Sequence, residues 1–241
     1  MAASEGPTGR EGPHAFVADL ERPLLSTDDH HHFARVVRLR AGDPLTVSDG
    51  AGRWRACRFG DELDTDGPIE IVPPPTIPIS IAFALVKGQK PEWVTQKLTE
   101  LGVDVIRPFV AARSVVRWDP AKAESGAERL RRVAREAAMQ CRRCWLPEIA
   151  PLASFASIAA LGGTVLAERD GPPLRLGTGA VAIGPEGGWA PEERDHGLDT
   201  AGLGGHVLRA DTAAVAAATL LAAARSGDLP STESGQLKHR R

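Results

Sequence analysis

The sequence predicts an α/β protein with two units, a domain built on a parallel sheet and a small β-barrel in front of it. Three observations support this prediction. Short strand-like runs around a tight turn come first, a proline-rich spacer follows, and apolar runs then alternate with helical segments. Such alternation is typical of a parallel sheet covered by helices. With 241 residues and 42% hydrophobic content, the chain is long enough for both cores.

The spacer at residues 72–78 reads VPPPTIP. Successive prolines keep the backbone extended and cannot enter a helix or an interior strand. We therefore expect the barrel at residues 14–73 and the α/β domain at residues 79–228. Residues 1–13 and 229–241 are rich in small and polar residues, and we expect them to be flexible tails.

Four short runs predict the strands of the barrel, because β-branched and aromatic residues gather in them: residues 36–37, 45–47, 54–59 and 69–72. The DGAG sequence at residues 49–52 predicts the hairpin turn between the second and third runs.

The α/β domain is expected to contain five interior strands, since five runs are apolar enough to be buried on both faces: residues 79–86, 103–110, 164–167, 180–183 and 206–208. Helices are expected at residues 92–101, 121–144 and 191–199. A last helix at residues 212–224 consists almost entirely of Ala, Val, Leu and Thr. A helix without a polar face must be buried all round, which favours a homodimer interface. A central core helix within one subunit is the alternative.

The formal net charge of −2 gives no overall attraction to nucleic acid, but the arginines are clustered. Residues 129–143 contain six arginines and one acid, and residues 35–58 contain six arginines and two acids. Clustered guanidinium groups favour a surface for phosphates. Two solvated faces remain the alternative.

Metal and membrane sites are not expected. The CxxC pair at Cys141 and Cys144 has no second pair, and Cys57 is remote, so reduced packing thiols in a cytoplasmic protein are the favoured interpretation. Adjacent histidines at residues 30–32 would point in opposite directions in a strand and could not share one metal ion. No run of eighteen apolar residues predicts a membrane span.

Two segments contain glycines, which leave the backbone bare because they carry no side chain. Residues 180–188 read AVAIGPEGG, and residues 203–213 read LGGHVLRADTA. Glycine admits positive φ and lets a flat ligand approach the peptide N–H and C=O groups. The pattern predicts a cofactor bound by backbone. The phosphate-binding GxxxxGK[ST] motif is absent, and residues 202–205 lack the full dinucleotide motif, which disfavours a hydride-transfer cofactor.

GPEGG followed by LGxxxLRxxTA resembles the RsmE-type ribosomal RNA small subunit (16S) uracil-N3 methyltransferases of the SPOUT superfamily. KGQKPEWVTQKLTELGV at residues 87–103, RSV at 113–115 and EAAMQCRR at 136–143 extend the resemblance over residues 80–220. HHHFARVVRL at residues 30–39 resembles the PUA-like RNA-binding barrel of the same family. Ordinary chain topology disfavours threaded folds, so the trefoil knot of the methyltransferase domain is implied by the resemblance alone.

The resemblance implies that S-adenosyl-L-methionine (SAM) donates a methyl group to N3 of a specific uridine in 16S ribosomal RNA. The implied partners are this RNA or the small ribosomal subunit, together with a second copy of the chain, and no metal. The implied cofactor-binding residues are Glu168, Gly184, Pro185, Glu186, Gly187, Gly188, Leu203, Leu208, Thr212 and Ala213. The implied RNA-binding residues are Arg35, Arg38, Arg113, Gln140 and Arg143.

Arg209 is the expected catalytic residue. The imide proton at N3 must leave before the nitrogen attacks, and the negative charge then spreads over O2 and O4, where a guanidinium group would stabilise it. A salt bridge from Arg209 to Glu186 or Asp211 is the alternative.

Relatives carry glutamate where this chain has Asp211, and we expect Asp211 to cap the following helix. Two other functions stay open. The chain could be a SPOUT-fold RNA-binding protein whose cofactor site has decayed, or a SPOUT methyltransferase that acts on another RNA.

Overall fold

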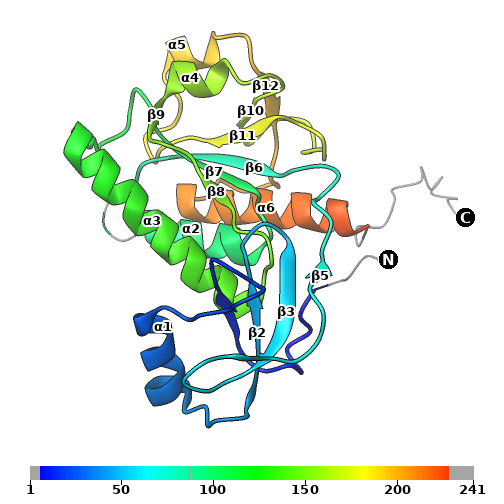
Figure 1. Ribbon diagram of the computed structural model, residues 1–241. Helices are drawn as coiled ribbons and strands as arrows, with labels where there is room; N and C mark the ends of the chain where they lie inside the picture. Colours follow the sequence, from blue (N-terminus) through cyan, green and yellow to red (C-terminus); the bar gives the residue numbers. More distant parts are fainter. Residues whose placement is uncertain (1–5, 87, 89, 228–241) are drawn as a thin grey trace, which may run out of the picture.

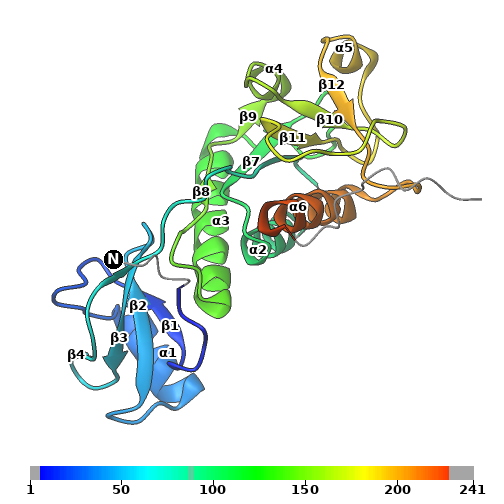
Figure 2. The same ribbon diagram turned by 90° about the vertical axis from the view of Figure 1, so that its right-hand side faces the viewer.

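The proline-rich spacer separates two units in the computed structural model, which describes residues 6–86, 88 and 90–227 (Figure 1). The unit before the spacer is a small sheet, and the unit after it is a larger sheet with helices on both faces (Figures 1 and 2). The predicted fold class, an α/β domain with a parallel sheet preceded by a small β unit, is confirmed. The trefoil knot stays a prediction.

The first unit contains five strands: β1 (His14–Phe16), β2 (Pro44–Ser48), β3 (Arg53–Arg58), β4 (Asp64–Thr65) and β5 (Glu70–Ile71). Their order is β1-β2-β3-β4, and β5 also pairs with β3. The hairpin turn between β2 and β3 needs Gly52, because φ there is 91° and a Cβ would lie 2.5 Å from the ring of Trp145. Residues 6–13, predicted as a tail, lie against this unit: the Pro13 carbonyl accepts from the Thr46 N–H.

The strand predicted at residues 36–37 is wrong. Helix α1 (Thr27–His32) runs directly into a π-helical turn, η1 (Phe33–Val37), and the Ser26 side chain caps α1 by accepting from the Asp29 N–H. Phe33 is buried in the core, whereas Val36 is 66% exposed. The two valines therefore have no sheet to join, and helix formation around Phe33 overrides their β propensity.

The second sheet has seven parallel strands: β6 (Ser80–Ala84), β7 (Val105–Val110), β8 (Glu148–Ile149), β9 (Ala153–Ser154), β10 (Val165–Ala167), β11 (Ala180–Ile183) and β12 (Asp199–Ala201). Their order is β12-β10-β11-β6-β7-β8, and β9 also pairs with β7. Alternate residues enter different cores, as period 2 requires: Ile81 and Phe83 face one side, Ala82 and Ala84 the other.

Two element predictions near the chain's end are wrong. Residues 206–208 form no strand, and β12 takes the sheet edge instead by pairing with β10. The helix predicted at residues 191–199 ends early, as α5 (Pro191–Arg194). Gly197 has φ 78°, which turns the chain from α5 into β12.

Helices α2 (Lys90–Glu100), α3 (Pro120–Cys141) and α6 (Ala210–Ser226) cover one face of this sheet, and α4 (Phe155–Ala159) and α5 cover the other (Figures 1 and 2). The inner face of α6 is buried, at Ala213, Ala214, Ala217, Ala218 and Leu221. Its outer face is less buried, since Thr219 is exposed and Val215 and Leu220 are half-buried. None of the described helices has the length and apolarity needed to cross a bilayer.

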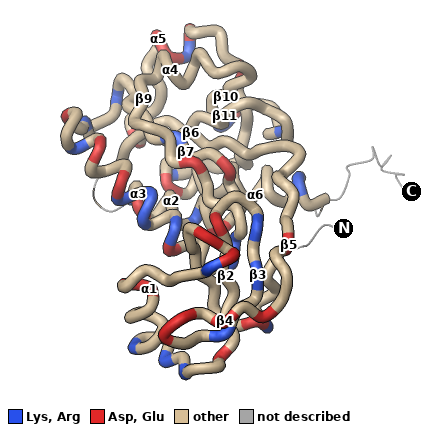
Figure 3. The backbone as a smooth tube through the Cα atoms, viewed as in Figure 1, with Lys and Arg blue, Asp and Glu red and all other residues tan. Residues whose placement is uncertain are grey.

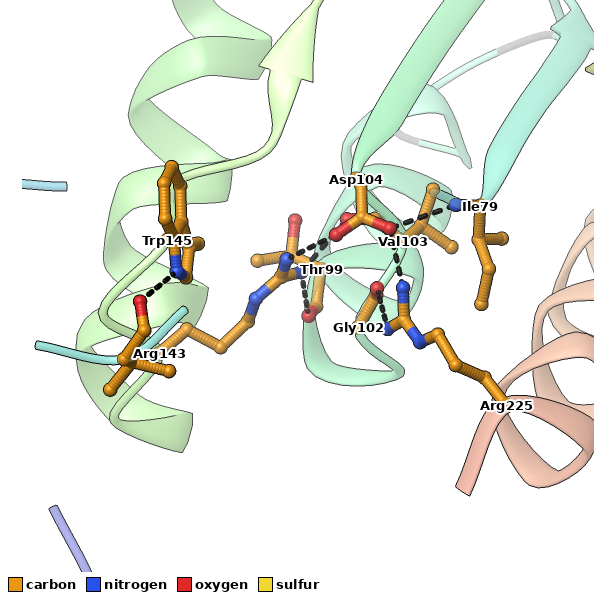
Figure 4. Close-up of polar contacts among 9 residues, drawn as sticks. Ile79, Thr99, Gly102, Val103, Asp104, Arg143, Trp145 and Arg225 are labelled. Atoms are coloured by element: carbon orange, nitrogen blue, oxygen red, sulfur yellow. Dashed lines mark hydrogen bonds and ion pairs between the residues drawn. The ribbon is translucent and has the colours of Figure 1, made fainter. Parts of the chain in front are cut away.

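Asp104 directly precedes β7 and contacts three other segments: the start of β6, the end of α6 and the residues after α3 (Figure 4). Its carboxylate accepts from the Ile79 N–H at 2.8 Å and pairs with Arg225 of α6 at 2.5 Å and with Arg143 at 3.4 Å. Both arginine side chains also donate to backbone carbonyls at the end of α2, Arg143 to Thr99 and Val103 and Arg225 to Gly102. We name Asp104, Arg143 and Arg225 the Asp104 cluster.

Helix α3 attaches the first unit next to this cluster. Arg135 pairs with Asp29 at 2.7 Å and lies over the ring of Phe16. Just beyond the helix, the Trp145 indole donates to the Val72 carbonyl at 3.0 Å. The two units are therefore joined through side chains as well as through the spacer.

Candidate cofactor site

The two bare segments meet at the carboxyl ends of neighbouring strands in the second sheet. Strands β12, β10 and β11 are parallel neighbours, so the segments that follow them leave from the same edge. With the first turn of α6, residues 168–170, 184–186, 188–189, 203–204 and 206–208 line a pocket of about 400 Å³. A pocket of this size fits a small-molecule ligand.

Most of the predicted cofactor residues line this pocket. They are Glu168, Gly184, Pro185, Glu186, Gly188, Leu203, Leu208 and Ala213, whereas Gly187 and Thr212 do not line it. Sequence reasoning missed other lining residues, among them Arg169, Trp189, Arg194 and His206. A signal for Trp189 was present, because a large apolar residue directly follows the glycine pair.

Trp189 explains why the loop after β11 is bare. The side chain is 2% exposed, and its indole N–H donates to the Ala167 carbonyl at the end of β10. A Cβ on Gly184 would lie 3.0 Å from the Trp189 ring, closer than most side chains tolerate. Gly188 has φ 68°, a conformation that favours glycine. The loop is therefore folded tightly over one indole, and its backbone forms part of the pocket wall.

Arg113 lies beside the same loop, because its guanidinium donates to the Gly187 carbonyl at 3.1 Å. The segment that carries it follows β7 and is fixed by a buried carboxylate: Glu193 of α5 accepts from the backbone N–H groups of Ala112 and Ala190. Glu193 is thus structural, and it places the exposed Arg113 at the rim.

Arg209 lies between two residues that line the pocket, Leu208 and Ala210, and its side chain is exposed. The expected alternative, a salt bridge to Glu186 or Asp211, is wrong. Lys90 is the cation that pairs with both carboxylates, at 3.6 Å and 3.2 Å. Among the described residues, no ion pair engages the Arg209 guanidinium, which leaves it available to a ligand.

The capping role expected for Asp211 is also wrong. Arg209 is the N-cap residue of α6, and Asp211 lies in the first turn, where it accepts from the Thr212 N–H. Burial would raise the pKa of Asp211, but the hydrogen bond from Lys90 and the backbone N–H of Thr212 outweigh burial and hold the pKa below its ordinary value. Asp211 is therefore paired with Lys90 directly after Ala210 of the pocket wall.

The residues expected to bind RNA divide into two groups. Arg35, Arg38, Arg113 and Gln140 are exposed. Arg143 is not free for RNA, because its guanidinium is engaged by the Asp104 cluster and by two backbone carbonyls and its side chain is only 15% exposed. Figure 3 shows basic residues along α3 and at the far end of the first unit, interspersed with acidic ones.

Within the described part of the chain, no group of three or more His, Cys, Asp or Glu residues could hold a metal ion. The histidines at residues 30–32 lie in α1, and the His30 ring stacks on Phe59. All three cysteines are free thiols, and burial raises the pKa of Cys144 to about 12. Cys57 and Cys144 are buried, and Cys141 is half-buried.

Known proteins match both units. The family model for an RNA methyltransferase domain matches residues 73–222, and the model for an RNA methyltransferase PUA domain matches residues 25–65. The protein named ribosomal RNA small subunit methyltransferase E from Mycobacterium bovis is 33% identical over 80% of this chain and 83% of its own length. The chain belongs to this RNA methyltransferase family. The PUA match falls on the first unit and the methyltransferase match on the second.

Two solved structures of methyltransferases share the fold over nearly their whole length. One, from Porphyromonas gingivalis and described as an rRNA-methyltransferase, has a TM-score of 0.75 at 26% identity and covers 90% of this chain and all of its own. The other, from Legionella pneumophila, has a TM-score of 0.74 at 26% identity, covers 88% of this chain and 97% of its own, and was solved with SAM bound.

Proposed function

We propose that this methyltransferase transfers a methyl group from SAM to N3 of a specific uridine in 16S ribosomal RNA of the small subunit. The observation that carries the proposal is the convergence of the two bare segments on one pocket at a single sheet edge. The name of the Mycobacterium bovis relative supplies the ribosomal RNA, and the Legionella pneumophila structure supplies the cofactor. Such RNA would meet the protein in the cytoplasm.

The pocket fits SAM in its chemistry. Backbone groups of residues 184–188 would bind the polar edges of the cofactor, and Leu203, Leu208 and Ala213 would cover its apolar surfaces. Glu168, held by Arg194 at 2.8 Å, offers a fixed acceptor. SAM supplies a methyl group on a positively charged sulfur.

Arg209 would stabilise the charge that develops on the base. Loss of the imide proton to water puts negative charge on O2 and O4 of the uracil, and a guanidinium with no ion-pair partner among the described residues can bind one of these oxygens while N3 stays free to attack. Holding N3 beside the methyl group turns the encounter of two molecules into a local step. The wall formed by Leu203, Leu208 and Trp189 would keep water out of this contact.

RNA would lie across both units. Arg35 and Arg38 on the PUA unit, Gln140 on α3 and Arg113 at the pocket rim are the exposed residues proposed to contact it. Arg38 ends η1 with φ 65°, an unusual conformation for a side chain other than glycine.

The less buried outer face of α6 supports a homodimer. Apolar residues Val215, Ala216 and Leu220 are half-buried there, and Thr219 is exposed. Light scattering at micromolar concentration should give twice the chain mass, and a monomer would contradict this part of the proposal.

The function is tested with small ribosomal subunits from a bacterial strain that lacks its own enzyme for this methylation. The purified protein and SAM should produce 3-methyluridine in 16S RNA, detected by mass spectrometry of nucleosides. Methylation of transfer RNA alone would instead support a methyltransferase for another RNA. Calorimetry that shows no SAM binding up to millimolar concentration would support an RNA-binding protein with a decayed site.

A further inference from the structure

Lys90, the first residue of α2, reaches carboxylates from two segments that flank the pocket. Its Nζ lies 3.6 Å from Oε1 of Glu186, in the loop after β11, and 3.2 Å from Oδ2 of Asp211, in the first turn of α6. Glu186 lines the pocket, and Asp211 directly follows Ala210, which also lines it. One ammonium group therefore lies between the two halves of the site.

The other carboxylates of the pocket each have an arginine of their own. Glu168 pairs with Arg194 at 2.8 Å, and Asp170 pairs with Arg169 at 3.2 Å. Glu186 and Asp211 share Lys90 alone, because among the described residues no other Lys or Arg nitrogen lies within 4.0 Å of either carboxylate. The group formed by these two acids and Lys90 thus carries one net negative charge, and it would carry two without the ammonium.

This charge distinguishes the donor of the proposed reaction from its product. The sulfur of SAM is a positively charged sulfonium, and after transfer the sulfur of S-adenosylhomocysteine is a neutral thioether. The rest of the two molecules is the same. The net negative charge of this three-residue group therefore attracts the donor more than the product. The same charge repels the phosphates of an approaching RNA.

We propose that Lys90 sets the net charge of the group that it forms with Glu186 and Asp211 beside the cofactor pocket, and thereby how strongly the pocket prefers the sulfonium donor over the thioether product. The inference rests on the proposed function. Lys90 acts through Glu186 and Asp211, so it is a positioning residue and not a catalytic one. With Lys90 in place, the residual charge favours the donor while the repulsion of RNA stays small.

Calorimetric titration of the full chain with SAM and with S-adenosylhomocysteine tests this role. In Lys90→Met the ratio of the two affinities should shift toward SAM by about fivefold, since one unit of positive charge beside the pocket is removed. Lys90→Arg keeps the charge and should keep the ratio of the wild type. Adding Glu186→Gln to Lys90→Met lowers the negative charge again and should move the ratio back.

Lys97 provides a matched control on the same helix. It pairs with Glu100 at 2.8 Å, so Lys97→Met removes an equal charge from an equivalent pair away from the pocket. The ratio should not change in this variant. Lys90→Met should also weaken binding of a 16S RNA fragment about threefold at low salt, and the difference should shrink as salt is added.

An equal change in both affinities in Lys90→Met would overturn the inference, because a merely structural bridge would affect donor and product alike. A shift of the same size in Lys97→Met would also overturn it. If the wild type binds neither molecule, the proposed function fails and this inference fails with it. If the wild type binds both and Lys90→Met leaves their ratio unchanged, only the role of Lys90 is wrong.

Discussion

Carboxylates pair with basic side chains in two regions, and the two regions differ in burial. One is the pocket rim, where Lys90 pairs with Glu186 and Asp211 and Arg194 pairs with Glu168. The other is the Asp104 cluster. At the rim, Lys90 and Arg194 are 38% and 55% exposed, and each ion pair is a single contact. In the Asp104 cluster the three side chains are 15–25% exposed, and both arginines also donate to backbone carbonyls. Exposed pairs contribute little to stability, whereas breaking a buried pair is costly. The rim charges are thus free to serve a ligand, and the Asp104 cluster serves the fold.

The largest effect is expected where the cluster loses its carboxylate. Asp104→Ala leaves two poorly exposed guanidinium groups without their anion and the Ile79 N–H without its acceptor, so the free energy of unfolding should fall by roughly 3–5 kcal/mol. Urea unfolding measures this. The exposed pair of Asp170 and Arg169 is the control, and Asp170→Ala should cost less than about 0.5 kcal/mol. Equal losses in the two variants would remove the distinction between the regions.

A pH effect is expected from His14, which lies in β1 and is 2% exposed. Burial, with a smaller contribution from the charge of Arg142, lowers the pKa of His14 from 6.5 to about 4. Between these two values the unfolded chain binds a proton that the folded chain does not, so stability present above pH 6.5 is lost as the pH falls toward 4. The loss is about 3 kcal/mol.

Urea unfolding of His14→Gln between pH 7 and pH 4.5 checks this effect. The variant should be less stable than the wild type at pH 7, because the hydrogen bonds between the ring and the hydroxyl groups of Thr46 and Ser48 change. Its stability should fall less steeply toward low pH. His31→Gln, a change at an exposed histidine, should retain the slope of the wild type. Parallel slopes for all three proteins would show that His14 is not the responsible group.

A smaller effect is expected in the loop after β11. Gly184→Ala places a methyl group 3.0 Å from the Trp189 ring, so the loop must shift. Stability should fall by about 1 kcal/mol and SAM affinity by roughly tenfold. Gly205→Ala in the second bare segment is the control, because a Cβ there meets no atom within 4 Å. Calorimetry compares the two variants, and an unchanged affinity in Gly184→Ala would separate this glycine from the pocket.

The smallest effect on stability is expected for Arg209→Ala, because the side chain is exposed and makes no ion pair among the described residues. The free energy of unfolding should stay within about 0.5 kcal/mol of the wild type. The turnover number should nevertheless fall by about 100-fold with SAM affinity nearly unchanged, as for a group that acts in the transition state. Equal losses of turnover and affinity would assign Arg209 to ground-state binding.

Local sequence patterns predict the interior strands and the pocket well. Apolar runs at residues 180–183 and 103–110 correspond to β11 and β7, and the glycines after β11 indicate the pocket wall. Patterns fail where a competing local structure exists. The two valines at residues 36–37 suit a strand, yet the helix that buries Phe33 continues through them.

Contacts between distant residues are the part that sequence reasoning could not predict. Asp104 meets Arg143 and Arg225 across 39 and 121 residues, and nothing near Asp104 indicates either partner. Lys90 lies within a motif that resembles the family, but its contacts depend on the positions of the loop after β11 and the first turn of α6. Arg143 matches an RNA-facing motif, and only the fold shows that its guanidinium is already bound.

Helix α6 begins at the pocket, where Ala210 and Ala213 form part of the wall, and it ends with Arg225 held by Asp104. Its 17 residues make a straight rod about 25 Å long. One end of this helix lines the cofactor pocket, and the other is paired with Asp104, near the contacts that attach the first unit. A movement of the first unit would therefore be transmitted through α6 to the pocket wall, and the same helix would influence the binding of both substrates.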